Sequence, residues 1–299
     1  MTHQSVLLKE TIKFLDPKPG DFIVDGTVDG GGHATAILEK IMPGGMLLGI
    51  DWDRRMVETT KQRIAEILSP KFEIRNLRME QGNYADLPEI LQKRNLPKAD
   101  GLLLDLGFSS EQLESSGKGF SFQKDEPLVM TYDTERKSVA QILREAKEND
   151  LADIIFKFGG ERMSRRIAKA IKERGKRKAI VTSGELAEIV RSAVPKNYER
   201  GRIDPATRTF QALRIYANDE LGNLERMLQN LPDVLRPEGR AVIISFHSLE
   251  DKLIKNAFRD YTKAGKGEIL TKKPIMASEE ESQENPRSRS AKLRAAKLL

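Results

Sequence analysis

The feature that most constrains this fold is an alternation, up to residue 106, of short apolar runs with amphipathic stretches of helical spacing. The apolar runs have the length of buried strands, and the stretches between them have the length of helices. Strands that are each followed by a helix pair in parallel, and their helices cover both faces of the sheet. The sequence therefore predicts an α/β fold with a mostly parallel sheet. The expected strands are 22–25, 46–50, 72–77 and 101–106, and the expected helices are 34–41, 56–68 and 87–91.

The alternation stops after residue 106, and a strand pattern returns only at 241–246. A loop rich in Gly, Ser and Phe comes first, and helical patterns follow it, one of them opened by the capping sequence Thr182-Ser183-Gly184-Glu185. An interruption of roughly 100 residues is far longer than an ordinary connection, so we expect an inserted helical domain. The expected divisions are a sheet domain in two parts (1–107 and 217–270), the insert (108–216), and a basic C-terminal tail with Pro and Ser (271–299). Within this tail, the segment 285–290 is expected to be mobile without RNA.

Positive charge is concentrated in the expected insert. The net charge of the chain is +6, whereas residues 135–216 alone hold 20 lysines and arginines against 11 acidic residues. A localised basic surface is typical of proteins that bind a phosphate backbone. The absence of cysteine excludes disulfides and Cys-ligated metals, and three scattered histidines make us expect no metal site. Neither a membrane span nor a signal peptide is evident, which predicts a cytoplasmic protein.

A glycine-rich turn directly follows the first expected strand and contains Gly30, Gly31 and Gly32 ahead of His33. Glycines let a ligand approach the backbone, and the N-terminus of the next helix offers free N–H groups to an anion. Asp51 closes the second strand, where a carboxylate can accept hydrogen bonds from both ribose hydroxyls of a nucleoside. This combination favours a nucleoside ligand over a tight turn beside a surface aspartate.

The nucleoside that fits best is S-adenosylmethionine. The dinucleotide pattern G-x-G-x-x-G fails because Ala34-Thr35 stand where the third glycine belongs, and a G-K-[ST] loop is absent. The single carboxylate of S-adenosylmethionine needs only a few loop amides, and its ribose diol remains for Asp51. Asp105 ends the fourth strand, at the edge where open α/β sheets bind ligands. Asp105 lies either beside the reacting atoms or simply caps the following loop, and its position alone leaves both roles open.

Six segments also carry a family resemblance. They are DGTVDGGGHA (25–34), LLLDLGFSSEQL (102–113), GFSFQKDEPL (119–128), DPATRTFQALRI (204–215), GRAVIISFHSLEDKLIK (239–255) and NPRSRSAKLR (285–294). Together they resemble the 16S ribosomal RNA (cytosine-N4) methyltransferase family of the MraW type, over nearly the whole chain. The resemblance implies a class I, Rossmann-like methyltransferase fold with a helical insert. It also implies methylation of the exocyclic N4 of a cytidine in the decoding region of 16S rRNA, within the small ribosomal subunit.

The resemblance also assigns cofactor-binding residues in this sequence. Those at the methionine end of S-adenosylmethionine are Gly31, Gly32 and His33, with Gly30 in the same turn; Asp51 holds the ribose, Tyr84 lies by the adenine, and Asp105 and Gln112 complete the site. Tyr84 stands where the family usually has Phe, which preserves a stacking face. Asp29 replaces the usual first loop glycine, and Val129, Thr131 and Asp204 also depart from the family pattern. No catalytic role carries over to the last three.

Methyl transfer to a cytosine amino group defines what a catalytic residue must do. The amino nitrogen is a poor nucleophile because its lone pair is delocalised into the ring. A carboxylate that accepts its hydrogen bonds helps it to pyramidalise and can receive the proton that leaves. We expect Asp105 to be this acceptor, the alternative being that Asp105 only orients the cofactor.

The target cytosine must be single-stranded or flipped out, because pairing hides its amino group. Aromatic residues of the insert are candidates for stacking on the base, and arginines, above all those of a basic helix expected at 161–174, for binding phosphates. The alternatives are packing in the insert core for the aromatic residues and a solvated basic face for the arginines. His247, after the last expected strand, has either a function on the substrate side or a structural, hydrogen-bonded role. The candidates are Phe120, Phe122, Arg162, Arg165, Arg166, Arg208, Arg214 and His247.

Two other functions are alternatives. A nicotinamide-dependent oxidoreductase needs the missing third glycine of the turn. A non-catalytic RNA-binding factor for ribosome assembly, on a methyltransferase scaffold, is compatible with the departures at Asp29, Val129, Thr131 and Asp204.

Overall fold

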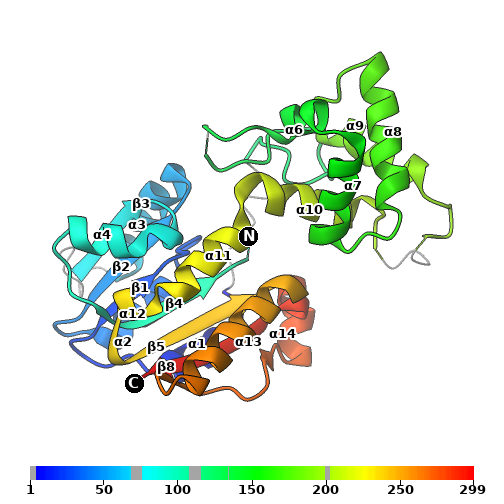
Figure 1. Cartoon of the computed structure of the whole chain (residues 1–299). Helices are drawn as coiled ribbons and strands as arrows, with labels where there is room; N and C mark the ends of the chain where they lie inside the picture. Colours follow the sequence, from blue (N-terminus) through cyan, green and yellow to red (C-terminus); the bar gives the residue numbers. More distant parts are fainter. Residues whose placement is uncertain (1–4, 69–75, 108–115, 134, 199–202) are drawn as a thin grey trace. The chain divides into compact units, whose positions relative to one another are not determined.

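The computed structural model describes residues 5–68, 76–107, 116–133, 135–198 and 203–299 (Figure 1). The chain forms two compact units. The first, here called the sheet unit, comprises Met1–Phe108 and Leu221–Leu299, and the second, here called the insert, comprises Ser109–Glu220.

The sheet unit is built on one mixed sheet with the strand order β3-β2-β1-β4-β5-β8-β6, and β7 pairs with β8. The strands are β1 Phe22–Asp25, β2 Met46–Asp51, β3 Leu77–Gln81, β4 Ala99–Asp105, β5 Leu235–Ser245, β6 Gly267–Ile269, β7 Ile275–Met276 and β8 Lys292–Leu298. Strands β1 to β5 pair in parallel, and β8 runs antiparallel to β5, β6 and β7. The parallel core brings the carboxyl ends of β1, β2 and β4 to one edge, which is where open α/β sheets bind ligands.

Helices cover both faces of this sheet, as the sequence predicted. Successive strand residues alternate between two apolar layers: Ile23 packs in one with α1, α2 and α3, and Val24 in the other with α4, α11, α12 and α13. Burial on both faces explains why the central strands are continuous apolar runs. The helices are α1 Leu8–Leu15, α2 Gly32–Ile41, α3 Arg54–Leu68, the 3-10 helix η2 Tyr84–Asp86, α4 Leu87–Lys93, α11 Glu220–Gln229, α12 Leu231–Val234, α13 Ser248–Lys263, α14 Glu279–Glu284 and the 3-10 helix η4 Pro286–Ser290.

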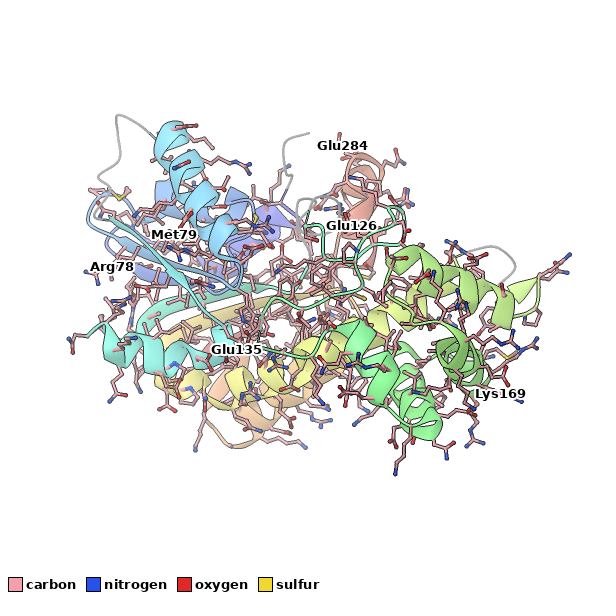
Figure 2. The ribbon with its side chains drawn as sticks, turned by 90° about the horizontal axis from the view of Figure 1, so that it is seen from above. Arg78, Met79, Glu126, Glu135, Lys169 and Glu284 are labelled. Carbon is pink, nitrogen blue, oxygen red and sulfur yellow. The ribbon has the colours of Figure 1, made fainter. Side chains whose placement is uncertain are left out.

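The third strand was predicted in the wrong place. It was expected at 72–77, of which 72–75 lie outside the described residues, and the structure puts β3 at Leu77–Gln81, paired with β2. Within β3 Leu77 is buried and Arg78 exposed, and Figure 2 labels Arg78 and Met79 on this outermost strand. An edge strand needs few apolar residues, so its sequence is less recognisable than that of a central strand.

The expectation of a C-terminal tail at 271–299 was also wrong. Strand β8 lies inside the sheet, between β5 and β6, and pairs with β5 from Lys292 to Lys297. Ser288, in the segment expected to be mobile, is fully buried. The charged residues of β8 made it unrecognisable as a buried strand in the sequence. In the structure Arg294 is only 7% exposed, because it donates to both carboxylate oxygens of Asp251, at 2.6 and 3.3 Å. A buried arginine that is paired in this way is compatible with a strand interior.

The insert is helical, as expected, and its chain leaves the sheet unit after β4 and returns before β5. Helix α7 packs on α8 and α10, and α9 packs on α8. The first half of the predicted capping box is confirmed, since the Thr182 side chain accepts from the Glu185 N–H; the Glu185 carboxylate accepts from the N–H of Val181, one residue before the N-cap, at 3.0 Å. The helices are α6 Val139–Glu145, α7 Glu148–Gly159, α8 Ser164–Arg177, α9 Ser183–Ala193 and α10 Ala206–Asn218.

The described part of the loop before these helices, 116–133, is fixed by hydrogen bonds to the loop itself and to the start of α9. The Gly119 N–H donates to Oε2 of Glu126 (3.0 Å), which Figure 2 labels, and the Leu128 N–H donates to the Val181 carbonyl (2.8 Å). Pro127 and Thr182 form an isolated antiparallel bridge. The long Gly/Ser/Phe-rich segment is therefore part of the packed insert.

Candidate active site at the carboxyl edge of the sheet

Three neighbouring parallel strands each end in an aspartate. These are Asp25 on β1, Asp51 on β2 and Asp105 on β4, with exposed fractions of 0%, 5% and 7%. The sequence singled out Asp51 and Asp105 but gave Asp25 no role. The same strand-end position would have identified Asp25, because β1 lies between β2 and β4 in the sheet.

The glycine-rich turn connects β1 to α2 and needs its glycines for steric reasons. Gly31 caps α2 with φ of 80°, a conformation that favours glycine. A Cβ at Gly26 would come within 2.5 Å of Leu104 Cδ2. The Val28 N–H donates to the Ile50 carbonyl (3.0 Å), so the turn is held against the end of β2. Gly32 is the first residue of α2, which therefore begins inside the glycine run.

Asp51 holds the turn by its two carboxylate oxygens. Oδ2 accepts from the Asp29 N–H at 3.1 Å, and Oδ1 accepts from the Asp53 N–H at 2.8 Å. From α3, the Thr60 hydroxyl donates to the Asp29 carbonyl at 2.5 Å, and Arg63 Nη1 donates to the Gly30 carbonyl at 3.1 Å. The turn is thus fixed from two sides before any ligand binds.

Asp105 is fixed in a similar way and faces His33. Its N–H donates to Thr27 Oγ1 (2.6 Å), and its Oδ1 accepts from the Gly107 N–H (3.1 Å). Its Oδ2 lies 3.5 Å from His33 Nε2, with both side chains less than 10% exposed. The sequence did not identify Thr27 as a partner of Asp105, because the two residues are far apart in the chain and no sequence pattern links them. Gln112, also expected here, lies outside the described residues.

Tyr84 borders the same turn. Its Cβ lies 3.0 Å from the position that a Cβ of Gly26 would take. The short 3-10 helix Tyr84–Asp86 is positioned by Asn83, whose side chain accepts from the Ala85 N–H at 2.9 Å. The structure therefore brings together the expected cofactor residues that it describes: the glycine turn with His33, then Asp51, Tyr84 and Asp105.

Burial controls the ionisation of this edge. It raises the pKa of Asp25 to about 6 and that of Asp51 to about 7. The pKa of Asp29 is raised well above its usual range, by burial first and by the neighbouring Asp51 carboxylate second. Carboxylates that are reluctant to ionise together are stabilised by a cation placed among them. The electrostatics of the edge therefore favour a positively charged ligand.

The residues present fit S-adenosylmethionine. Among the described residues, Asp25 Oδ2 and both ring nitrogens of His33 are buried without a hydrogen-bond partner. Buried polar atoms usually have such partners, and a bound ligand would supply them here. Helix α2 begins in the glycine turn and offers its first N–H groups to a carboxylate, and the strand-end carboxylates suit both a ribose diol and a cationic sulfonium.

The two phenylalanines proposed for base stacking pack inside the insert. Phe120 is 5% exposed, and its ring stacks on Tyr132 with centroids 5.0 Å apart. Phe122 meets Phe210 edge-on at 5.0 Å, and the Arg191 guanidinium lies 5.6 Å from its ring centroid. Both rings thus take the alternative position that the sequence left open, within the insert's own packing.

Arg214 is not placed to bind phosphate. It forms a bidentate ion pair with Glu220, in which Nε donates to Oε1 at 2.8 Å and Nη2 donates to Oε2 at 3.0 Å, and both side chains are only about 15% exposed. A buried pair of this kind is a structural link, which corrects the expectation of an RNA contact. Arg208 also lies on α10 and is half-buried.

The basic helix carries an exposed cationic face. In α8, Ile167 and Ile171 are buried, whereas Arg165 and Arg166 on the helix, and Arg162 just before it, are exposed. In the described part of the chain these three arginines form no ion pair. Lys169, labelled in Figure 2, lies on the same face and is 3.8 Å from Glu173. This face is available to an anionic partner.

His247 acts as the N-cap of α13. Its Nδ1 accepts from the Glu250 N–H at 3.4 Å, and Glu250 Oε2 accepts from the His247 N–H at 3.2 Å. This reciprocal arrangement is a capping box, in which each residue satisfies a free N–H of the first helical turn. The position therefore has the structural role that the sequence offered as its alternative.

A parallel sheet with helices on both faces, a glycine turn after β1 and aspartates at the strand ends together define a class I S-adenosylmethionine-dependent methyltransferase. The chain belongs to the MraW methylase family, whose model matches residues 1–299. No helix in the described parts of the chain has the length and apolar character required to cross a bilayer.

Two curated relatives carry the name ribosomal RNA small subunit methyltransferase H. The protein from Syntrophus aciditrophicus (strain SB) is 43% identical over 313 residues, which cover 99% of this chain and 98% of that relative. The protein from Deinococcus deserti (strain DSM 17065 / CIP 109153 / LMG 22923 / VCD115) is 44% identical, with coverage of 100% and 94%. Among solved structures, Aeropyrum pernix fibrillarin in complex with S-adenosyl-L-methionine aligns with a TM-score of 0.40 and 13% identity, covering 93% of this chain and 67% of fibrillarin.

Proposed function

We propose that this protein transfers the methyl group of S-adenosylmethionine to the exocyclic N4 of a cytidine in the decoding region of 16S rRNA, in the small ribosomal subunit and in the cytoplasm. The observation that carries the proposal is the gathering of Asp25, Asp51 and Asp105 around the glycine turn. The names of the relatives support the substrate. The exposed basic face of α8 supports an RNA partner.

The cofactor-binding residues act from three directions. Asp51, already fixed by the Asp29 and Asp53 N–H groups, accepts hydrogen bonds from the ribose hydroxyls. Tyr84 offers its ring to the adenine, and Gln112 completes the site. The N–H groups at the start of α2 meet the methionine carboxylate, a role that falls to the turn residues Gly30, Gly31, Gly32 and His33.

When bound, S-adenosylmethionine supplies an electrophilic methyl group on a positively charged sulfur. Asp105 accepts hydrogen bonds from the cytosine amino group and thereby directs its lone pair away from the ring. Asp105 would take up the proton that N4 loses on methylation. The Thr27 and Gly107 contacts hold the Asp105 backbone and carboxylate in position for this transfer.

Binding of RNA falls to the insert. Arg162, Arg165 and Arg166 present exposed guanidinium groups to phosphates. Arg208 remains a candidate for the same role. Base stacking by Phe120 or Phe122 requires each ring to leave the contacts that it makes within the insert.

The direct test is to incubate the protein with methyl-labelled S-adenosylmethionine and with 30S subunits from cells that lack this modification. We expect label in a single cytidine of the decoding region, with the methyl group on N4, as read by nuclease digestion and mass spectrometry. Protein-free 16S rRNA, tested in parallel, shows whether the assembled subunit is required. Absence of label in both substrates, with S-adenosylmethionine bound normally, would support the non-catalytic assembly factor instead.

A further inference from the structure

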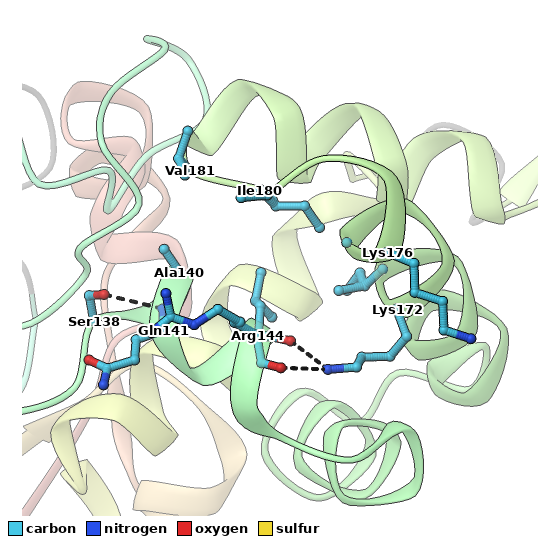
Figure 3. A pocket seen from close by; sticks show the side chains of 12 residues that line it. Ser138, Ala140, Gln141, Arg144, Lys172, Lys176, Ile180 and Val181 are labelled. Atoms are coloured by element: carbon cyan, nitrogen blue, oxygen red, sulfur yellow. Dashed lines mark hydrogen bonds between the residues drawn. The ribbon is translucent and has the colours of Figure 1, made fainter.

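The insert contains a pocket that the proposed reaction does not use. It lies between α6, the second half of α8 and the segment that leads to α9, and its volume is about 420 Å³ (Figure 3). A volume of this size is within the usual range of small-molecule sites, roughly 300–1,000 Å³. All residues that line it belong to the insert, so the pocket is complete within one unit.

The floor of the pocket is apolar. Leu143 from α6 and Ile171 from α8 are buried beneath it, and Ile180 closes it on the side of α9. Val181, which also lines the pocket, is 50% exposed. The pocket thus offers a flat apolar group a surface from which water is easily displaced.

A fixed positive charge stands at one side of this floor. Lys172 Nζ donates to the carbonyls of Leu143 (2.9 Å) and Arg144 (3.0 Å), where α6 ends (Figure 3). These two bonds hold the ammonium group in place, so its charge is available to a ligand without the entropy loss of ordering a free lysine.

Two further cations lie at the rim. The Arg144 side chain is 73% exposed and lies 3.7 Å from Glu145, whose carboxylate is held more closely by Lys137 (2.6 Å) and Gln141 (2.9 Å). Lys176 is exposed and pairs with no described residue. None of the described residues that line the pocket is acidic, whereas Arg144, Lys172 and Lys176 are cationic, so its lining carries net positive charge.

We propose that this pocket binds one nucleotide of the single-stranded RNA substrate, other than the methylated one, with phosphate groups of the chain at the cationic rim residues Arg144 and Lys176 and the base on the apolar floor. At the α6 end, the Ser138 hydroxyl and the side-chain oxygen of Gln141 are offered to the edge of the base, since the Gln141 amide nitrogen already donates to Glu145. The occupant is single-stranded because a paired base cannot enter such a recess. The inference rests on the proposed function, since it assumes an RNA substrate, and it adds a subsite that fixes the RNA at a second point.

The charge requirement is tested with the double variant Arg144→Gln/Lys176→Gln in the full-length protein. We expect its affinity for a short, labelled single-stranded RNA to fall roughly tenfold, and the salt slope of log K to flatten by about 1.4, as for two lost phosphate contacts. KM for 30S subunits should rise and kcat should stay unchanged. The matched control is Lys61→Gln/Lys93→Gln, which removes the same charge from exposed positions of the sheet unit.

The pocket itself is tested with Ala179→Trp, which fills the recess from an exposed position without a change of charge. We expect the same loss of single-stranded RNA affinity, no change in duplex RNA binding and an unchanged melting temperature. Unchanged affinity in Ala179→Trp, or equal losses in the control variant, would overturn the subsite and leave only a diffuse basic surface. An equal loss of binding to polyglutamate would also overturn it, in favour of an acidic protein partner.

The outcome is separable from that of the proposed function. RNA affinity is measured by fluorescence anisotropy and needs no turnover. A wild-type protein that binds RNA through this pocket but does not methylate 30S subunits contradicts the proposed reaction and not the subsite. A wild-type protein that methylates, with KM insensitive to both pocket variants, contradicts the subsite and not the reaction.

Discussion

The carboxyl edge of the sheet and the exposed face of α8 differ in both charge and burial: the first is acidic and buried, and the second is basic and exposed to water. At the sheet edge, Asp25, Asp51 and Asp105 are nearly excluded from water. On α8, Arg165 and Arg166 are exposed and pair with no described residue. The first region concentrates negative charge where the dielectric screening is weak, and the second spreads positive charge where water and salt screen it.

This difference indicates which interactions each region can support. A buried acidic edge interacts strongly with one small cation at short range, and it depends on pH more than on salt. An exposed basic face attracts a polyanion over a longer range, and it depends on salt more than on pH.

The largest effect is expected at the sheet edge, from Asp105→Asn. The amide cannot take up the proton from N4, so kcat should fall roughly 10²- to 10⁴-fold. The Kd for S-adenosylmethionine, measured by calorimetry, should change much less, since the amide oxygen still accepts from the Gly107 N–H. Asp260→Asn, an exposed change on α13, is the control. Weakened cofactor binding with normal kcat would mean that Asp105 only orients the cofactor.

At the basic face of α8, the triple variant Arg162→Gln/Arg165→Gln/Arg166→Gln should weaken RNA binding only. We expect a loss of RNA affinity of roughly tenfold or more at low salt and a salt slope flatter by about 2, because three phosphate contacts disappear. Cofactor affinity should not change. The comparison fails if the salt dependence of RNA binding is the same in the variant and in the wild type.

A smaller effect, on stability, tests the buried carboxylates. The folded-state pKa of Asp25 is about 6, against an ordinary value of 3.8, so the folded state favours the protonated form. This contribution to the free energy of unfolding is present below pH 3.8 and is lost as pH rises towards 6 and beyond. Asp25→Asn cannot ionise, and its oxygen can still accept from the Thr27 N–H.

Relative to the wild type, Asp25→Asn should therefore gain stability between about pH 4 and pH 7, by on the order of 2–3 kcal/mol. Urea unfolding of the ligand-free protein measures the difference. S-adenosylmethionine should reduce the gain more than S-adenosylhomocysteine, because only the former carries the positive sulfur. A gain that is independent of pH would argue against a buried, titrating carboxylate at this edge.

The smallest effect is expected from Asp29→Gly. Asp29 has φ of 46°, in the left-handed region that favours glycine, and its carboxyl group is buried among other acids. The change should stabilise the protein by about 1 kcal/mol from backbone strain, with a further gain as pH rises above the ordinary pKa of an aspartate, because the buried carboxyl group is lost. Asn95→Gly, at an exposed residue with φ of 50°, measures the strain contribution alone. A lower melting temperature for Asp29→Gly would contradict this account.

Local patterns in the sequence were enough to predict the central sheet and most of the site. Continuous apolar runs identified β1, β2, β4 and β5 because these strands are buried on both faces. Strand-end position identified Asp51 and Asp105, and the missing third glycine excluded a dinucleotide. The same patterns misplaced β3, which is an edge strand, and missed β8, whose Arg294 is paired with Asp251 from another element.

By itself, the sequence determined the class of fold, the glycine turn and the location of the positive charge, because each depends on residues that are close together in the chain. Only the tertiary structure decided which polar residues are free to act. Phe122 packs against Phe210, Arg294 pairs with Asp251, and Asp25 joins the acidic edge. Burial and pairing are made by partners that folding brings together, and they set both the accessibility of a side chain and its ionisation.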